Sequence, residues 1–222
     1  MNETTTLITL VTVHIVALMS PGPDFALVVQ NAGRYGRQTG LMIALGLSLG
    51  ILLHSILSLT GASLLIHQHP TLFALLQGAG GSYLLWLGFG ALKGTWQLWQ
   101  QRRQSDIVSS PSHTPPARLI ANRKQALAKG FTTNILNPKA LVFFLSLLST
   151  LVPADMSLTG KSVAIGLLWI TSLLWFGMLA WLLTGARLQQ QLQRWTPAID
   201  ALCGLLFTVI GSMMLVNLLL SK

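Results

Sequence analysis

Charged residues are scarce in this 222-residue chain, and acidic residues are the scarcest of them. Only 9% of the residues are Asp, Glu, Lys or Arg, whereas a typical soluble domain has about 25%. Hydrophobic residues make up 52% of the chain, and its mean hydropathy is +0.63. This balance excludes an ordinary water-soluble fold and predicts a membrane protein.

Groups that many other functions require are also missing. The single cysteine, Cys203, excludes an internal disulfide and a CxxC metal site, and we expect it to be a small packing residue. The chain has no HExxH, GxSxG, phosphate-loop or dinucleotide motif, so we expect neither enzyme activity nor a cofactor. Its net charge of +9 comes from basic residues in short connections, without an aromatic-interleaved basic face, so no nucleic-acid partner is predicted.

Six apolar runs are long enough to cross a bilayer as helices, which takes about 20 residues each. They lie at about residues 7–30, 40–66, 72–92, 126–152, 158–183 and 197–220. The only long polar segment, residues 101–125, is rich in Ser, Pro, Gln and Arg. We therefore predict an all-α protein of six transmembrane helices, with three-helix units at residues 1–100 and 126–222 joined by a linker at 101–125.

Basic residues gather in alternate connections between these runs. Eleven Lys and Arg residues follow the first, third and fifth runs, whereas two lie on the opposite side. Because cytoplasmic connections carry an excess of Lys and Arg, we expect these three connections, including the linker, in the cytoplasm and both termini outside.

Proline motifs interrupt the first and fourth runs. They are Ser20-Pro21-Gly22-Pro23-Asp24 and Asn137-Pro138-Lys139. Proline and glycine disfavour a continuing helix, and a broken span is tolerated where its backbone lines a cavity. Ser20-Pro21 and Asn137-Pro138 each place a capping residue before proline, which predicts that a helix restarts there.

The two interruptions carry opposite charges. A restarting helix presents unpaired N–H groups that attract a carboxylate, and Lys139 adds a positive charge. Asp24 supplies a negative charge at the other interruption. The pair therefore suits a zwitterionic substrate. Two structural alternatives remain open: a proline kink that only shapes packing, and an Asp24–Lys139 ion pair that locks the halves together.

The two halves share a pattern. Each opens with a broken run and closes with two glycines seven residues apart, namely Gly81 and Gly88, then Gly204 and Gly211. With three spans in each copy, the second copy is inverted in the membrane. Matched interruptions in inverted repeats are typical of a transport site at the repeat interface.

Two histidines lie within the apolar runs. His14 precedes Asp24 by ten residues, and His54 continues a stripe with Gly46 and Gly50 that should face a neighbouring helix. Asp24, His14 and His54 are the candidates for proton coupling. Packing roles with satisfied hydrogen bonds are equally compatible with the two histidines.

At these motifs the chain resembles the LysE/RhtB superfamily of bacterial amino-acid exporters, especially its threonine/homoserine branch. The resemblance is carried by residues 13–25, by Asn134-x-x-Asn137-Pro138-Lys139-Ala140 and by residues 81–88. It implies proton-driven export of small neutral amino acids through the inner membrane. With the charge bias, this places both termini in the periplasm, and the chemistry of the two proline motifs places the substrate there. Relatives often carry an acid in the fifth span, whereas this chain has none there.

Other functions stay open at this point. The chain is either such a transporter or a non-transporting scaffold or accessory subunit, and export of another small solute such as a metal cation is a further possibility. The lack of a second acid within the membrane argues against metal cargo. Gly36, Gly40, Gly90 and Gly94 permit helix contacts within one chain or in a homo-oligomer.

Overall fold

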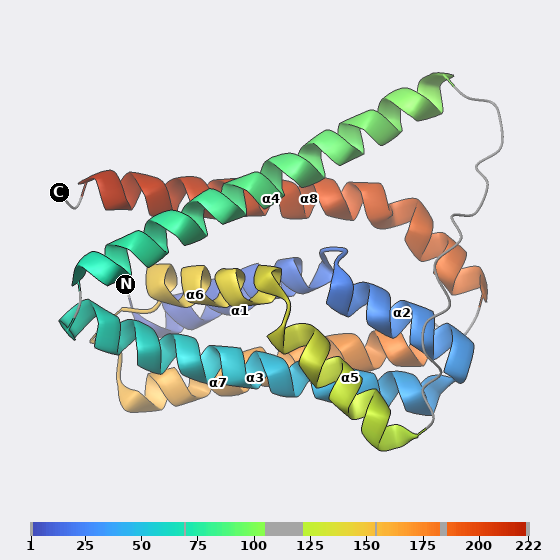
Figure 1. Ribbon diagram of the computed structural model, residues 1–222, viewed down its shortest axis with the longest axis horizontal. Helices are drawn as coiled ribbons and strands as arrows, with labels where there is room; N and C mark the ends of the chain where they lie inside the picture. Colours follow the sequence, from blue (N-terminus) through green and yellow to red (C-terminus); the bar gives the residue numbers. More distant parts are fainter. Residues whose placement is uncertain (1, 69, 105–121, 154, 183–185, 221–222) are drawn as a thin grey trace.

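The computed structural model describes residues 2–68, 70–104, 122–153, 155–182 and 186–220, and all regular secondary structure within them is helical (Figure 1). The helices are α1 (Glu3–Met19), α2 (Pro23–Tyr35), α3 (Arg37–Gln68), α4 (Pro70–Gln104), α5 (Arg123–Ile135), α6 (Pro138–Leu151), α7 (Leu158–Leu182) and α8 (Ala186–Leu220). The predicted linker falls mostly outside the described residues, which stop at 104 and resume at 122.

The long apolar helices identify a multi-pass membrane protein. Residues Arg37–Gly61 of α3, Leu158–Leu182 of α7 and Trp195–Leu220 of α8 each have the length and composition of a membrane span. The pairs α1–α2 and α5–α6 pass the same test only when each pair is taken as one bent span. The described residues thus contain three to five candidate spans. The count of six and the inverted repeat stay predictions, because α4 is not among the candidates.

Both proline motifs lie at sharp breaks between helices. The axes of α1 and α2 differ by 57°, and those of α5 and α6 differ by 59°. At the second break Asn137 caps α6, with its Oδ1 accepting the N–H of Lys139 at 3.0 Å, and Pro138 is the first helical residue. The predicted restart at Asn137-Pro138 is therefore confirmed.

The predicted restart at Ser20-Pro21 is wrong by two residues. Ser20 instead ends α1, and Gly22 precedes α2, which opens at Pro23. A residue before proline is forced into extended backbone, and this applies to both Ser20 and Gly22. The first proline therefore stops one helix, and the second starts the next. The Ser20 hydroxyl therefore does not cap α2.

Glycines bring α3 directly against α5. A Cβ added at Gly46 would meet the carbonyl oxygen of Leu127, and one at Gly50 would lie 2.5 Å from Asn134 Oδ1. One turn further, His54 is 3% exposed, and its Nε2 lies 3.3 Å from the carbonyl oxygen of Asn134. The predicted stripe does face a neighbouring helix, and His54 lies on the packed side.

The helices α4 and α8 cross at the two glycine pairs noted in the sequence. A Cβ on Gly88 would lie 2.8 Å from the carbonyl oxygen of Gly204, and one on Gly211 would lie 2.7 Å from that of Gly81. The crossing is seen at the top of the molecule (Figure 1). Side chains larger than hydrogen at these positions would push the two backbones apart.

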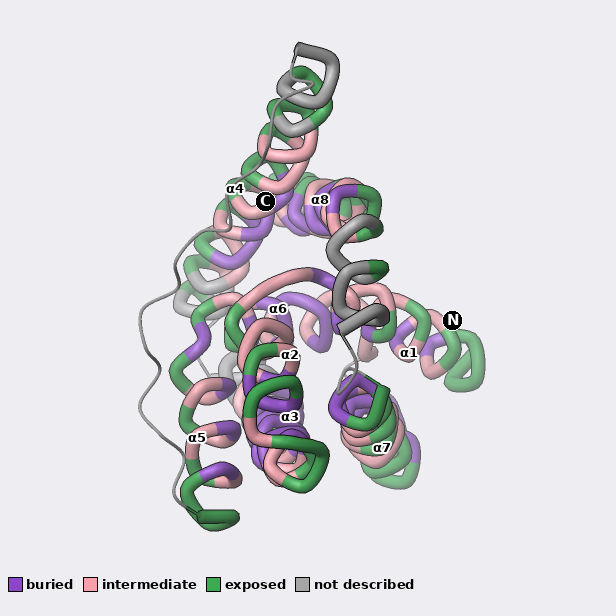
Figure 2. Tube along the Cα trace, turned by 90° about the vertical axis from the view of Figure 1, so that its right-hand side faces the viewer, coloured by how far each residue is buried: buried purple, intermediate pink, exposed green. Residues whose placement is uncertain are grey.

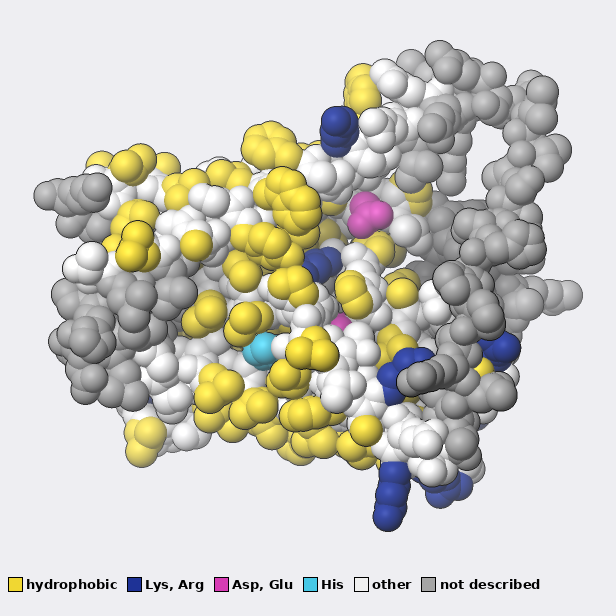
Figure 3. Space-filling view, viewed as in Figure 1, with side chains coloured by type: hydrophobic (Ala, Val, Ile, Leu, Met, Phe, Trp, Pro, Cys, Tyr) yellow, Lys and Arg dark blue, Asp and Glu magenta, His cyan; other side chains and the backbone are white. Residues whose placement is uncertain are grey.

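Apolar side chains cover much of the outer surface as well as the core. Buried residues line the faces where helices meet (Figure 2), whereas Trp86, Leu174 and Leu205 are more than half exposed. Figure 3 shows apolar side chains across most of one face, with most Lys and Arg toward the end where α2 joins α3. This distribution matches a molecule whose middle contacts lipid and whose one end is basic.

Candidate functional site

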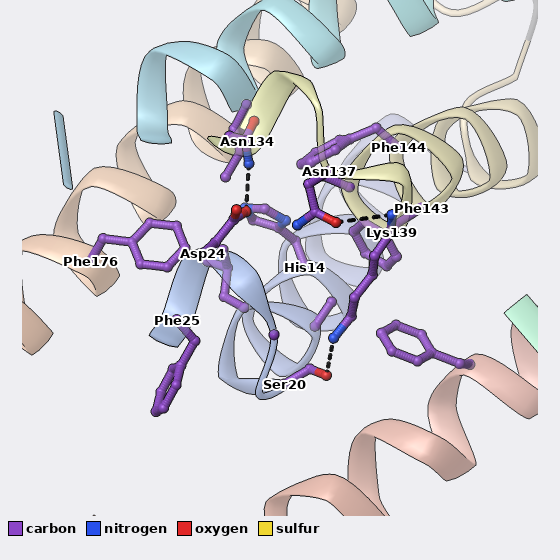
Figure 4. A pocket seen from close by; sticks show the side chains of 16 residues that line it. His14, Ser20, Asp24, Phe25, Asn134, Asn137, Lys139, Phe143, Phe144 and Phe176 are labelled. Carbon is purple, nitrogen blue, oxygen red and sulfur yellow. Dashed lines mark hydrogen bonds between the residues drawn. The ribbon is translucent and has the colours of Figure 1, made fainter. Parts of the chain in front are cut away.

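The two helix breaks lie side by side and line a half-open cavity of about 60 Å³ (Figure 4). Its polar lining comes from Ser20 and Asp24 beside the first break, from Asn134, Asn137 and Lys139 beside the second, and from His14 on α1. Phenylalanines supply most of the apolar wall: Phe25, Phe143, Phe144, Phe176 and Phe207. The volume holds a few water molecules, so a larger solute requires the walls to move apart.

Lys139, the second residue of α6, reaches across to the first break. Its Nζ donates to the hydroxyl of Ser20 and to the carbonyl oxygen of Pro21, the latter at 3.2 Å. The same ammonium lies 5.2 Å from the ring centroid of Phe207, within range of a cation–π contact. Gly22 lies beside it, and a Cβ there would lie 3.4 Å from Nζ, an ordinary van der Waals contact.

Asp24, the second residue of α2, is held from the opposite direction. Its Oδ2 accepts a hydrogen bond from Asn134 Nδ2 on α5 at 2.7 Å (Figure 4). The Asn137 side chain also faces this carboxylate. Asp24 and Lys139 do not form the direct ion pair that the sequence left open as an alternative. In the described residues, each charged group is instead hydrogen-bonded to neutral groups.

These contacts tie the two breaks together. The hydrogen bond from Lys139 to Ser20 joins α6 to the end of α1, and the bond from Asn134 to Asp24 joins α5 to the start of α2. The bonded residues are 119 and 110 positions apart in sequence. If one bent span changes its bend while the other does not, at least one of these contacts is disturbed.

The charges at the two breaks relate differently to their own helices. A helix begins with free N–H groups and a partial positive charge. Asp24 at the start of α2 offsets that charge, whereas Lys139 at the start of α6 adds to it. The cavity therefore has a negative pole that is partly balanced and a positive pole that lacks an anionic partner in contact.

The two candidate histidines have different positions. His14 lines the cavity, packs against Phe144 at 5.5 Å between ring centroids, and places Nε2 2.9 Å from Ser172 Oγ. His54 stacks on the same Phe144 at 6.0 Å but is not part of the cavity lining. The structure thus brings His14, Asp24 and Lys139 to one site and leaves His54 behind its aromatic wall.

Several site residues were not assigned a role from the sequence. Asn134 was noted only within a family motif, although it holds Asp24. On α8, Asp200, Cys203 and Phe207 follow helical spacing toward the site; Cys203 is fully buried with Sγ 3.3 Å from the carbonyl oxygen of Val16. Asp200 also had no role assigned from the sequence, yet its charge interacts with Lys139. The spacing of three and four residues was the available signal.

The LysE type translocator family model matches residues 15–218 of this chain. The chain belongs to the LysE family of translocators. It is therefore a transport protein and not an enzyme. The threonine efflux protein of Escherichia coli (strain K12) is 32% identical over 210 residues, which cover 95% of this chain and 97% of that relative.

Other relatives align over similar lengths. The threonine efflux protein of Salmonella typhi is 31% identical over 209 residues, covering 94% of this chain and 97% of the relative. An uncharacterized membrane protein of Haemophilus influenzae is 26% identical over 211 residues, covering 95% and 96%. No solved structure matches this chain. Among the described residues, no group of three or more His, Cys, Asp or Glu side chains is arranged to hold a metal ion.

Proposed function

We propose that this translocator exports a small neutral amino acid across the bacterial inner membrane. The observation that carries the proposal is the pair of opposite poles in one cavity, with Lys139 at the start of α6 and Asp24 at the start of α2. A zwitterion is the solute that satisfies both poles without adding net charge. The names of the relatives support an amino acid, since two of them are threonine efflux proteins.

In this proposal the substrate carboxylate binds at the second break. It accepts from Lys139 Nζ at the positive start of α6, and it takes the place of Ser20 and Pro21 as the partner of the lysine. The substrate ammonium binds Asp24. Hydrogen bonds to charged groups contribute about 1.5–3 kcal/mol each, so removing either charge should weaken binding at least about tenfold.

Transport then follows from exchange of partners at the breaks. In the closed arrangement, Lys139–Ser20 and Asn134–Asp24 hold the bent spans together. A bound zwitterion competes for Lys139 and Asp24, which frees the two spans to change their relative angle. We further propose that Asp24 carries the coupled proton, with His54 as its relay, and that the two halves are inverted repeats with both termini in the periplasm.

The experiment is an export assay with matched variants. The protein is expressed in an amino-acid-rich bacterial strain, and extracellular amino acids are quantified by mass spectrometry at equal membrane abundance. Lys139→Ala and Asp24→Asn should each abolish accumulation of one or a few neutral amino acids. The control variants Lys93→Ala and Asp155→Asn change exposed charges outside the cavity and should export normally.

An unchanged amino-acid profile on expression of the unaltered protein would refute the proposal. Normal export by both site variants would refute the two-pole site while leaving the transport class intact. If the site variants instead only lowered membrane abundance, with unchanged solute movement by the remaining protein, a non-transporting scaffold would be the better description.

A further inference from the structure

We propose that Nδ1 of His14 accepts a hydrogen bond from a hydroxyl group on the substrate side chain, so that the site selects hydroxyl-bearing amino acids over apolar ones of the same shape. The inference rests on the proposed function, because it assumes an amino-acid substrate in the cavity. It assigns His14 a role in specificity rather than in proton relay.

The hydrogen bonds of Ser172 determine which nitrogen of His14 carries the proton. Ser172 Oγ lies 2.6 Å from the carbonyl oxygen of Leu168, which can only accept, so the single hydroxyl hydrogen is donated there. Ser172 Oγ must then act as the acceptor toward His14 Nε2, 2.9 Å away. Nε2 therefore carries the hydrogen, and in the neutral ring Nδ1 is left with a lone pair.

Burial favours the neutral ring. His14 is 1% exposed, and its ring packs against Phe143 and Phe144 with centroid distances of 6.4 and 5.5 Å. A charged imidazolium in this aromatic wall would be poorly solvated, and its second N–H would have no acceptor. The ring is thus a fixed donor on one side and an acceptor on the other.

The acceptor side has no partner among the residues that the structure describes. Nδ1 of His14 is buried and makes no hydrogen bond among the described residues. Leaving a buried acceptor unpaired is unfavourable, so such groups in native proteins call for an explanation. His14 lines the cavity, but Nδ1 itself has essentially no accessible surface in this arrangement, so a solute supplies the missing donor once the walls move apart to admit it.

The position of His14 indicates which part of the substrate it meets. The carboxylate and ammonium are assigned to Lys139 and Asp24, and Figure 4 shows His14 between these two side chains. Its ring belongs to the part of the wall formed with Phe143 and Phe144, and we place the substrate side chain against that part. A hydroxyl there can donate to Nδ1, whereas a methyl group would leave the nitrogen unpaired.

The test compares threonine with valine, in which a methyl group replaces the hydroxyl. Purified protein in liposomes transports a mixture of the two, and the ratio of their rates is independent of the amount of active protein. We expect the unaltered protein to prefer threonine by about tenfold or more, the factor associated with leaving one buried acceptor unpaired. His14→Phe keeps the aromatic wall but removes the acceptor, and should bring the ratio close to one.

His54 offers a matched control. It also stacks on Phe144, directs Nε2 to a carbonyl oxygen and has an unpaired Nδ1, but it does not line the cavity. His54→Phe should therefore keep the threonine preference, whatever its effect on total rate. Ser172→Ala removes the acceptor that fixes the proton on Nε2, and should reduce the preference without abolishing transport.

Equal rates for threonine and valine in the unaltered protein would overturn the inference, as would a preference that survives His14→Phe. In both cases amino acids are still transported, and the proposed function stands. Failure to transport any amino acid would instead overturn the proposed function, and this inference with it.

Discussion

Replacing Gly50 with alanine should disturb the candidate site, although Gly50 does not line the cavity, because it would change the contact between α3 and α5. The new Cβ would lie 2.5 Å from Oδ1 of Asn134 and 2.9 Å from its Cβ and Cγ. Real Cβ atoms essentially never come this close, so α3 and α5 must separate or the Asn134 side chain must turn. Either movement breaks the 2.7 Å hydrogen bond by which Asn134 holds Asp24.

The loss of stability caused by this clash can be separated from the effect of helix propensity by substituting a second glycine on the same helix. Alanine is favoured over glycine in a helix by about 1 kcal/mol, and this gain applies to Gly50→Ala and Gly61→Ala alike. A Cβ at Gly61 meets nothing within 4 Å. Overpacking a tight contact costs about 1–3 kcal/mol, so the two variants should differ in stability by that amount.

The assays are thermal unfolding in detergent and export from cells. A difference of about 1–3 kcal/mol corresponds to roughly 2–12 °C in the unfolding midpoint for a chain of this length. The hydrogen bond to Asp24 involves a charged group and contributes about 1.5–3 kcal/mol, which corresponds to roughly a 10- to 150-fold change in an equilibrium constant. We therefore expect the export rate of Gly50→Ala to decrease by a factor in that range. Gly61→Ala should export normally.

A double-mutant cycle locates the clash. In an Asn134→Gly background the atoms that meet the new Cβ are gone, so Gly50→Ala should no longer destabilise the protein. An equal loss of stability in both backgrounds would show that the reasoning about Asn134 is mistaken. Normal export by Gly50→Ala would contradict the link between this helix contact and Asp24.

Two further predictions concern parts of the fold away from the cavity. Gly88→Ala should lower the unfolding midpoint by several degrees, because its Cβ would meet the backbone of α8, whereas Gly90→Ala, with nothing within 4 Å, should leave it unchanged or raise it slightly; equal midpoints would exclude a tight α4–α8 contact. Glu3 accepts from the backbone N–H of Ser157 at 2.8 Å and from its hydroxyl at 3.1 Å, at the start of α7. Glu3→Ala should therefore cost about 0.3–1 kcal/mol in thermal unfolding, and Glu3→Gln less, since it keeps one acceptor; a larger loss in Glu3→Gln than in Glu3→Ala would contradict this account.

The sequence predicted helix starts correctly where they depended only on residues adjacent in the chain. Asn137-Pro138 was interpreted as a helix start because a capping side chain and a proline act on adjacent residues, and the structure has that cap. The same reading failed at Ser20-Pro21, where a second helix start, Gly22-Pro23, was available two residues later. This stretch of five residues contains two prolines, and local preference alone did not decide which of them starts the helix.

Contacts between distant helices were mostly out of reach. The glycine stripe on α3 indicated a close neighbour, but nothing in it identified α5 as the partner or Asn134 as the residue facing Gly50. Asp24 and Lys139 were paired because they are opposite charges in apolar runs, whereas the fold pairs each with a neutral group. Periodicity gives the face of a helix that is packed, and the crossing of helices decides what that face meets.

The hydrogen bonds between the two breaks also limit how this protein can diverge. Asp24 depends on Asn134, and Lys139 depends on Ser20, although each pair is separated by more than a hundred residues. A change at one member leaves the other with an unmet hydrogen bond in a partly buried site. New cargo preferences are therefore expected to arise through paired changes. Chimeras that take their two halves from different relatives should work only when both members of each pair are inherited from compatible parents.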